Sequence, residues 1–377
     1  MELASTLPMG DLAPAEADGY PRERLLEKYQ QVFRSGAIFY PTPYTFSRQL
    51  GQGRQGRVML VNRQGARGCV TQHALKIFDP SIYPSSAAYW TDMGRLAHQI
   101  TRLQHVRSPN LVSREIYEET EGIGYIQMEA IDGIDLEYFL GGSHLARARK
   151  RCTDAEWEAF NDVIFRTTRH RVTFQPGIAI YIMRRVLRGL EILHENGFVH
   201  SDVKPANLML DRLGYVKIID FGRAVQVDER VHYLFGTPLY MAPEIHRRGP
   251  SSVASDLYSV GLLGLQMLSE APLVADRAAA DETSLYAWKQ ALPRNIESIL
   301  PEHVVRNELF FQMLRRLIDP DPDRRFQTAE EAESAYEGLA LVHKQLVQTN
   351  QHAEYGRELE NYLNKLADLR TNTILLT

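Results

Sequence analysis

Short runs of apolar and β-branched residues, broken by glycine, mark the chain between Tyr44 and Ile131. They include RVMLV, HALKIF and GYIQMEAI, whereas one stretch near 86–106 has apolar residues at helical spacing. Runs of this length, bounded by turn residues, are typical of β-strands. The pattern therefore predicts a small, mainly β unit that contains one helix.

Helical spacing of apolar residues dominates from Leu136 onward, which predicts a second unit that is larger and α-rich. The clearest helical patterns cover 177–196, 255–269, 308–318 and 328–348. A short amphipathic helix is expected over 21–33, after a segment, 1–19, whose Ala, Pro, Asp and Glu show no periodicity. Residues 352–377 are mainly polar, with one more amphipathic segment.

Composition narrows the class of protein. The 377 residues suffice for two lobes or two modest domains, and 47 acidic against 43 basic residues give a formal charge of -4. This balance does not favour nucleic acid or an anionic membrane as a partner. Cys69 and Cys152 are too few for a disulfide framework. The longest apolar run, at 260–268, is about half a membrane span, and no signal-peptide pattern precedes it, so we expect a cytoplasmic protein without a membrane span.

The run LGQGRQGRV places Gly51, Gly53 and Gly56 between strand-like segments. Backbone N–H groups can approach phosphate oxygens where no Cβ intervenes, although ordinary hairpins show the same spacing. About twenty residues later, HALKIF surrounds Lys76 with apolar neighbours, which would direct its amine beneath the glycine loop. The alternative is an edge-strand lysine whose amine extends to water.

Two later segments carry polar groups beside apolar, strand-like runs. HSDVKPANLML places a carboxylate, an ammonium and an amide at Asp202, Lys204 and Asn207. KIIDFGRA places Asp220 at the end of an apolar strand, where a carboxylate could bind a cation that also contacts phosphates. An aspartate before a glycine turn is otherwise common at strand ends.

GTPLYMAPE and SDLYSVG follow further along the chain. In order and spacing, this set of motifs resembles a eukaryotic-type protein kinase of the Ser/Thr group. The resemblance implies an α+β, two-lobed protein kinase fold with a small β-rich N-lobe and a larger α-helical C-lobe. The boundaries that follow are 1–43 for an N-terminal tail with a short helix, 44–131 for the N-lobe, 132–340 for the C-lobe and 341–377 for a C-terminal helical tail.

The resemblance also assigns roles to matching positions. Lys76 is similar to the lysine that holds the α- and β-phosphates of ATP, and Asp202 to the catalytic base. Asn207 and Asp220 are similar to the two Mg²⁺ ligands, and Lys204 to the lysine that Ser/Thr kinases place near the transferred phosphate. The acceptor implied is a Ser or Thr hydroxyl of a protein. The implied ATP-binding positions are Gly51, Gly53, Gly56, Val58, Ala74, Lys76, Met128, Glu129, Ile131 and Asp135.

Within the ATP site, Met128 is expected at the back of the adenine pocket. Glu129 and Ile131 would contact the adenine edge through their backbones, so that their side chains matter little, and Asp135 would contact the ribose or a basic substrate. For each of these four residues the alternative is ordinary core and loop packing.

The catalytic loop departs from the family at Ser201, which stands where most members have the Arg that binds a phosphorylated activation loop. Between Gly222 and Gly236 the chain has no Ser or Thr, and its one hydroxyl is that of Tyr233. We therefore expect that Ser/Thr phosphorylation does not switch this loop.

A second departure is Gln99. The family pairs its lysine with a Glu about ten residues before a PN turn, and counting back from Pro109 gives Gln99. An amide can accept a hydrogen bond from an ammonium but lacks the charge that makes the contact strong. Either the counting is off, another acid serves Lys76, or activity is reduced. We expect Gln99 on the cleft-facing side of its helix, with or without a gap to Lys76, activity to be weakened without being lost, and Gln99→Glu to raise the rate a few-fold.

Two contacts within the C-lobe are also implied by the resemblance. Asp256 should be buried and should accept backbone hydrogen bonds from the catalytic loop. Glu244 and Arg325 should form a buried ion pair.

An insertion around 141–176 lengthens the chain before the catalytic loop, and its basic run RARKR either binds an acidic partner or is a solvated loop. The leading hypothesis is an ATP- and Mg²⁺-dependent Ser/Thr protein kinase. The alternative favoured by Gln99 is a pseudokinase that acts as a nucleotide-binding or scaffolding module. A small-molecule kinase is disfavoured because GTPLYMAPE resembles a segment that shapes a peptide groove.

Overall fold

The computed structural model describes residues 44–167, 172–220, 222, 224–227, 237–274, 281–334, 338–348 and 354–366, together with Gln30 and Arg34. Except for Gln30, the helix expected over 21–33 lies outside these residues, as do Tyr233 and most of the activation loop. The chain divides into two compact units, one of residues 1–45 and 63–71 and the other of residues 46–62 and 72–377. Among the described helices, none is both long and apolar enough to cross a membrane.

The described part of the first unit is mainly the turn that joins two strands. A short 3₁₀ segment, Ala66–Gly68, closes with a 3.1 Å hydrogen bond from the N–H of Cys69 to the carbonyl of Ala66. Arg67 adopts the left-handed conformation there, with φ of 53°.

The N-lobe consists of one five-stranded sheet and one long helix. The sheet has the order β1-β2-β3-β5-β4. Its strands are β1 (Tyr44–Gly53), β2 (Gly56–Gln64), β3 (Val70–Phe78), β4 (Arg114–Thr120) and β5 (Ile123–Glu129). The helix, α2 (Ser86–Leu103), begins where Ser85 accepts a hydrogen bond from the N–H of Ala88. Met93, Leu96 and Ile100 of α2 pack with buried side chains of the sheet, so that the expected β unit has its own core.

The C-lobe is helical, which confirms the predicted α+β class. Its helices before the catalytic loop are α3 (Leu136–Gly141), α4 (Leu145–Arg149), α5 (Asp154–Val163) and α6 (Pro176–Glu195). Those after it are α7 (Pro243–His246), α8 (Val253–Leu268), α9 (Glu282–Asn295), α10 (Glu302–Val305), α11 (Glu308–Leu317), α12 (Ala329–Ser334), α13 (Leu339–Gln348) and α14 (Tyr355–Leu366). The pattern expected over 328–348 thus forms two helices, with Gly338 between them.

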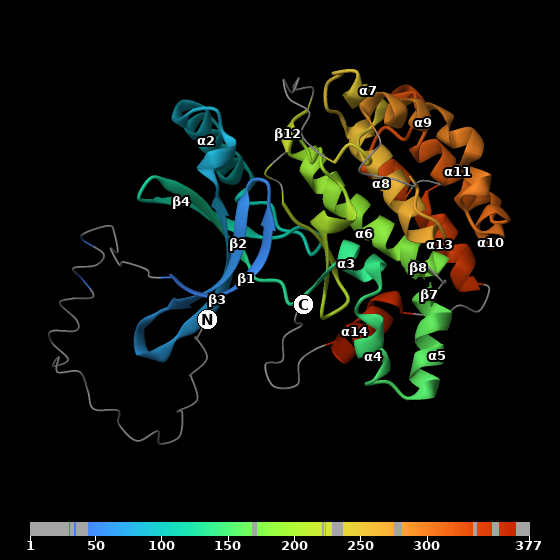
Figure 1. Cartoon of the computed structure of the whole chain (residues 1–377), viewed down its shortest axis with the longest axis horizontal. Helices are drawn as coiled ribbons and strands as arrows, with labels where there is room; N and C mark the ends of the chain where they lie inside the picture. Colours follow the sequence, from blue (N-terminus) through green and yellow to red (C-terminus); the bar gives the residue numbers. More distant parts are fainter. Residues whose placement is uncertain are drawn as a thin grey trace, which may run out of the picture. The chain divides into compact units, whose positions relative to one another are not determined.

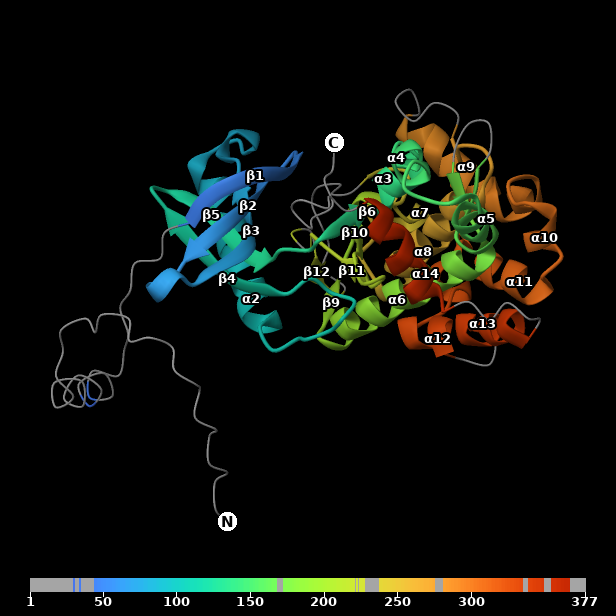
Figure 2. The ribbon, with the colours of Figure 1, turned by 90° about the horizontal axis from the view of Figure 1, so that it is seen from below.

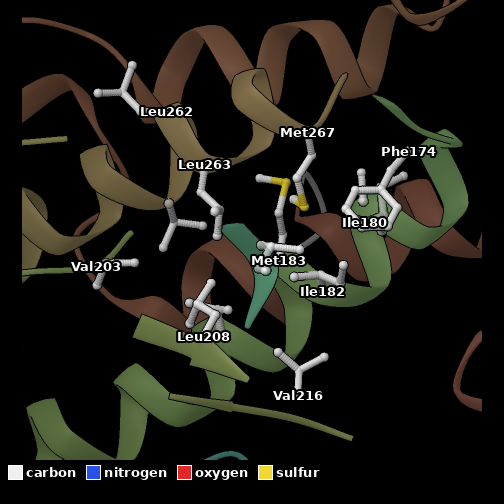
Figure 3. Packing of buried hydrophobic residues seen from close by; sticks show 14 of the residues in the cluster. Phe174, Ile180, Ile182, Met183, Val203, Leu208, Val216, Leu262, Leu263 and Met267 are labelled. Carbon is white, nitrogen blue, oxygen red and sulfur yellow. The ribbon is translucent and has the colours of Figure 1, made fainter. Parts of the chain in front are cut away.

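Helices α6 and α8 pack side by side at the centre of the C-lobe (Figure 1). Every residue of α8 from Ala254 to Leu268 is buried, which explains why its sequence is apolar around the whole helix. At Gly264 a Cβ would lie 2.8 Å from the sulfur of Met183 on α6, so the glycine permits the close approach of the two helices. Figure 3 shows Met183 beside Met267, with Ile182 and Leu263 nearby.

Three small strand pairings position the catalytic loop. Strand β10 (Leu208–Asp211) pairs with both β6 (Gly133–Asp135) and β11 (Val216–Ile218), while β12 (Val225–Gln226) pairs with β9 (Phe198–Val199). The pairing of Leu208 with Ile218 brings the end of the catalytic loop beside the residues that precede Asp220. The loop is therefore held between two backbone ladders.

The insertion and the C-terminal segment fold together. The insertion forms α4, α5 and the β7 (Phe165–Thr167) and β8 (Val172–Phe174) hairpin, and α14 lies against α4, α5 and α6 (Figures 1 and 2). His144 joins the two parts, because one ring nitrogen contacts the Tyr362 hydroxyl at 2.6 Å and the other the Phe139 carbonyl at 2.7 Å. Residues of the expected C-terminal tail thus belong to the C-lobe core.

Arg149 and Arg151 of the basic run form contacts within the protein. The guanidinium of Arg149 contacts Asp154 and lies 5.8 Å from the ring of Trp157, and Arg151 donates a 3.1 Å hydrogen bond to the carbonyl of Lys365. Lys365 in turn forms a 2.7 Å ion pair with Glu156. Arg151 and Lys365 thus connect the insertion to α14, whereas Arg149 makes its contacts within the insertion.

Candidate active site

A cavity of about 380 Å³ lies where the glycine loop, the end of β5 and the catalytic loop meet. Every residue assigned from the sequence to catalysis, to ATP or to metal lines it. In β3, Ala74 and Lys76 are two positions apart and therefore project from the same face of the sheet, opposite Met128 and Ile126 of β5. The structure thus brings together residues that are up to about 170 positions apart in sequence.

The three glycines of the loop differ in what surrounds them. Gly56 has φ of 143°, and a Cβ there would lie 1.9 Å from the carbonyl oxygen of Ile77, so this position requires glycine for the fold. A Cβ on Gly51 or Gly53 would meet no protein atom within 4 Å, although both residues line the cavity. The space above these two glycines is therefore open to the phosphates of a nucleotide.

The amine of Lys76 is buried between two acceptors. Its Nζ lies 2.5 Å from Oδ1 of Asp220 and 2.9 Å from Oε1 of Gln55 in the glycine loop. Burial alone would raise the pKa of the Asp220 carboxyl, but attraction and hydrogen bonding from Lys76 outweigh it and hold that pKa well below its usual range. The carboxylate that could bind a metal is therefore ionised.

Asp202 is held by donors from three directions. Its Oδ1 accepts a 3.2 Å hydrogen bond from the N–H of Thr237, and its Oδ2 lies 3.1 Å from Nζ of Lys204 and 3.0 Å from Nδ2 of Asn207. Lys204 also donates to the Thr237 hydroxyl at 2.9 Å. A carboxylate and an ammonium thus flank the hydroxyl-bearing segment that follows the activation loop.

Asp256 on α8 holds the backbone of the catalytic loop. Its two carboxylate oxygens accept backbone hydrogen bonds from His200 at 2.8 Å and Ser201 at 2.9 Å, and His194 contacts it at 2.9 Å. Asp256 is 1% exposed, which confirms its predicted role. Ser201 adopts φ of 64°, and its buried hydroxyl has no hydrogen-bond partner among the described residues.

Asn207 and Asp220 together suit a hard cation. The amide nitrogen of Asn207 donates to Asp202, so that Oδ1 of Asn207 can accept a cation. Lys76 bonds to Oδ1 of Asp220, so that Oδ2 of Asp220 can do the same. Mg²⁺ prefers oxygen ligands and commonly combines one or two protein groups with phosphates and water. Within the described residues there is no cluster of three or more His, Cys, Asp or Glu that could hold a metal without such help.

The hinge residues also have structural contacts. The carboxylate of Glu129 accepts hydrogen bonds from the N–H of Ser113 at 2.7 Å and from Lys217 at 2.8 Å. Its side chain therefore links the two lobes, and the expectation that its identity matters little is wrong. Asp135 accepts from the N–H of Tyr138 and so caps α3, and burial raises the pKa of its carboxyl.

Gln99 lies on the inner side of α2 but does not bond to Lys76. The side chain is 2% exposed, its Nε2 donates to the carbonyl of Ala224 at 3.1 Å, and its Oε1 accepts from Arg114 at 3.2 Å. Arg95, one turn earlier in α2, donates to the carbonyls of Gly222 and Ala224. Gln99 thus faces inward from α2, as expected, but Arg114 and the backbone after Asp220 satisfy its amide, and Lys76 bonds to Asp220 and Gln55.

Four residues of this arrangement were not found from the sequence: Gln55, Arg95, Arg114 and Thr237 as a partner of Asp202. Gln55 could have been noticed because it is the polar residue directly before the last glycine of the loop. Arg95 lies one helical turn from Gln99, and this spacing is a recognisable signal. Arg114 gives no such signal, since its position on β4 depends on a register shift between Arg114 and Ile116.

Comparison with known proteins agrees with this geometry. The protein kinase domain family matches residues 44–336. Serine/threonine-protein kinase PrkC of Bacillus subtilis (strain 168) is 25% identical over 254 residues, 64% of this chain and 32% of that protein. Serine/threonine-protein kinase PknG of Mycolicibacterium smegmatis is 27% identical over 320 residues, 79% of this chain and 35% of that protein.

The cAMP-dependent protein kinase catalytic subunit of Dictyostelium discoideum is 37% identical over 162 residues, 43% of this chain and 24% of that protein. The chain thus spans about a third or less of the length of these three relatives. Because the family match covers most of the chain and the matched motifs meet in one cavity, the chain belongs to the protein kinase family.

Proposed function

We propose that this chain is an ATP- and Mg²⁺-dependent protein kinase that phosphorylates Ser or Thr hydroxyls of proteins. The observation that carries the proposal is the position of Asp202, which contacts Lys204, Asn207 and Thr237 at the edge of the cavity that Lys76 and Asp220 line. Its relatives are named as serine/threonine-protein kinases, which supports the same acceptor.

The contacts of each side chain in the cavity are consistent with one role in phosphoryl transfer. Lys76, beneath the open glycines, would bind the phosphates, and Asp202 would orient the acceptor hydroxyl and take its proton. Lys204 would offset negative charge near the transferred group, because an ammonium in a partly dehydrated cleft interacts strongly with phosphate. Asn207 and Asp220 would hold Mg²⁺, which neutralises phosphate charge when bound.

Activity without activation-loop phosphorylation is part of the proposal. Ser201 cannot supply the cation that a phosphorylated loop would bind, and the loop lacks Ser and Thr. Arg95 and Gln99 instead attach α2 to the carbonyls of Gly222 and Ala224, without any phosphate. This attachment would keep α2 close to the catalytic residues in the unmodified protein.

We further propose that the enzyme works in the cytoplasm. Cys69 and Cys152 are both free thiols, as a reducing compartment favours. Fractionation of the source cells with antibody detection tests this proposal, and recovery of the protein outside the cytoplasmic fraction would contradict it.

The test of the activity is transfer of label from γ-labelled ATP to a Ser- and Thr-containing peptide library. Label should appear on Ser or Thr, should require Mg²⁺, and should disappear in Asp202→Asn. If ATP raises the melting temperature but no label is transferred, the chain is a pseudokinase. Label confined to Tyr would contradict the Ser/Thr assignment.

A further inference from the structure

Lys289 of α9 is a fully buried lysine outside the cavity described above. Its side chain is 0% exposed, and Nζ lies 2.6 Å from the carbonyl oxygens of both Pro238 and Met241. Nζ also lies 2.7 Å from Nε2 of His246, whose Nδ1 faces Glu282 at 3.4 Å. Burial lowers the pKa of Lys289 to about 7. In either protonation state the amine has the two N–H groups that the carbonyls need.

The carbonyls of Pro238 and Met241 both belong to one tight turn. This turn runs from Thr237, whose N–H and hydroxyl contact Asp202 and Lys204, to Met241. Inside it, the N–H of Tyr240 donates to the carbonyl of Thr237 at 2.9 Å. The hydroxyl of Ser259 on α8 donates to the carbonyl of Tyr240 at 2.8 Å.

The other side of the turn faces a smaller cavity of about 210 Å³, beside the catalytic loop. Pro238, Leu239 and Tyr240 line it, and Lys204 stands at its border. Leu285, one turn before Lys289 on α9, lines it as well. Helix α9 thus supplies both Leu285, which lines this cavity, and the amine of Lys289, which holds the turn that also lines it.

Burying an amine is costly unless its donors are satisfied, so a lysine in this place is not simply a space-filling residue. A methionine would fill a similar volume but would remove the donor of the Met241 carbonyl and would leave the Pro238 carbonyl with the His246 ring alone. Backbone groups that are left unpaired in a protein interior shift to find water or another partner. Loss of the amine would therefore change the conformation of the turn.

We propose that Lys289 is a positioning residue for the protein substrate, which fixes the turn 237–241 so that a peptide can bind in the smaller cavity beside Lys204. The proposal rests on the proposed kinase activity. Lys289 touches neither the nucleotide cavity nor the reacting atoms, so it acts through the turn. Binding of the peptide should depend on it, and binding of ATP should not.

The experiment measures four quantities for wild type, Lys289→Met and Lys289→Arg: KM for a peptide substrate, kcat, KM for ATP, and ATP hydrolysis without peptide. In Lys289→Met we expect the peptide KM to rise about tenfold, as for the loss of hydrogen bonds worth about 1.4 kcal/mol. KM for ATP and peptide-free hydrolysis should stay within twofold of wild type. Lys289→Arg, which keeps N–H donors, should recover part of the peptide affinity.

Gln290→Met is the matched control, because Gln290 is exposed on the same helix and receives the same side chain. It should behave as wild type in all four measurements. If Lys289→Met does not fold, Lys289→Gln replaces it, since the shorter neutral amide cannot reach both carbonyls and should raise the peptide KM in the same way.

An unchanged peptide KM in the folded variant would overturn the proposal, and so would an equal loss of ATP affinity and hydrolysis. A wild-type protein that phosphorylates no peptide would instead contradict the proposed kinase function. Failure of the function and failure of the role of Lys289 are therefore distinguishable.

Discussion

Oε1 of Gln99 accepts a 3.2 Å hydrogen bond from Nη1 of Arg114, a guanidinium whose pKa burial lowers to about 9. This contact occupies the acceptor that the family pattern would direct to Lys76. The lysine is held by Asp220 and Gln55 instead. In this protein α2 is therefore attached near the catalytic centre by Arg95 and Gln99, and not by an ion pair between a helix Glu and Lys76.

Gln99→Glu should not raise the phosphorylation rate, in contrast to the expectation from sequence. A carboxylate would keep its contact with Arg114 but would lose the N–H that donates to Ala224, and two oxygens would then face each other. Loss of one such hydrogen bond costs about 0.5–1.5 kcal/mol, so kcat/KM should fall by a factor of about 2–10. Steady-state kinetics with a peptide substrate measures this change. A several-fold increase would mean that Glu at this position reaches Lys76.

Asp220→Asn should abolish phosphoryl transfer while the protein stays folded. The substitution removes a charged metal ligand, and loss of one preorganised electrostatic group costs about 10²–10³ in kcat. The carboxylate is 34% exposed to the cavity, so water can replace part of the Lys76 contact and the melting temperature should change little. A filter assay with γ-labelled ATP and a thermal melt check the two parts separately. Loss of cooperative unfolding would show that Asp220 is structural.

The ion pair between Glu244 and Arg325 is bidentate, and Arg325 is buried as predicted from sequence, whereas Glu244 is partly exposed. Nη1 and Nη2 of Arg325 each lie 2.8 Å from a carboxylate oxygen of Glu244, and Arg325 also donates to the carbonyls of Asp319 and Ala254. Arg325→Met should lower the free energy of unfolding by up to about 3–5 kcal/mol, since it leaves a largely buried carboxylate and several carbonyls without their partner.

Glu244→Gln should cost less than Arg325→Met, because Glu244 is 18% exposed and the arginine keeps its carbonyl partners. Urea denaturation of both variants gives the two values. Equal and small losses would show that the pair contributes little to stability.

Gly177→Ala should displace α14 from the C-lobe. A Cβ at Gly177 on α6 would lie 2.1 Å from the Tyr355 hydroxyl and 2.3 Å from the ring carbon that carries it. Overpacking of this kind costs about 1–3 kcal/mol. Denaturation curves measure the cost, and limited proteolysis should cut near α14 sooner.

Gly94→Ala is the control for this substitution. Gly94 lies in α2, and a Cβ at this position would meet no atom within 4 Å, so alanine should stabilise its helix by up to about 1 kcal/mol. Replacing Tyr355 by Phe in the Gly177→Ala background should recover part of the loss. If Gly177→Ala is as stable as wild type, the contact between α6 and α14 is looser than described.

Lys289 should make stability depend on pH near neutrality. Its pKa is 10.5 in an ordinary setting and about 7 in the folded protein, where burial outweighs the attraction of Glu244 and Glu282. Between these values the unfolded chain holds a proton that the folded protein has lost, so stability rises with pH and is lost as pH falls toward 7.

The comparison that tests this effect is wild type against Lys289→Met, which retains Glu244, Glu282 and His246 but removes the charge that helps to lower the pKa of His246. Above pH 7 the difference in unfolding free energy should change in favour of wild type by up to about 1.4 kcal/mol per pH unit. Denaturation series at pH 6.5, 7.5 and 8.5 measure it. A difference that does not vary with pH would show that Lys289 remains protonated throughout.

Motif spacing was enough to place the residues that meet in the cavity. Lys76 lies within β3, Asp202 lies between β9 and β10, and Asp220 follows β11, so that strand pairing places all three residues near one another. The anchoring by Asp256 followed in the same way. These placements followed from the resemblance to protein kinases, which the order and spacing of the motifs carry.

The environment of Gln99 could not be predicted, because it depends on where Arg114 points. The register shift between Arg114 and Ile116 is an irregularity of β4, and such irregularities redirect side chains by an amount that no periodicity reveals. Likewise, the sequence predicts that α14 has an apolar face, but it does not predict that α4, α5 and α6 cover this face. A helical pattern predicts that a face is buried without indicating which surface covers it.

The contact between His144 and Tyr362 joins residues 218 positions apart. During synthesis the insertion therefore leaves the ribosome long before the helix that covers it. At roughly 5–20 residues per second, the delay is on the order of 10–40 s. Over that time the aromatic side chains of Phe139 and Phe165 lack the ring of Tyr362 that later packs against them. The nascent chain thus exposes an apolar surface that a chaperone could bind, and this part of the catalytic lobe is completed only when α14 arrives.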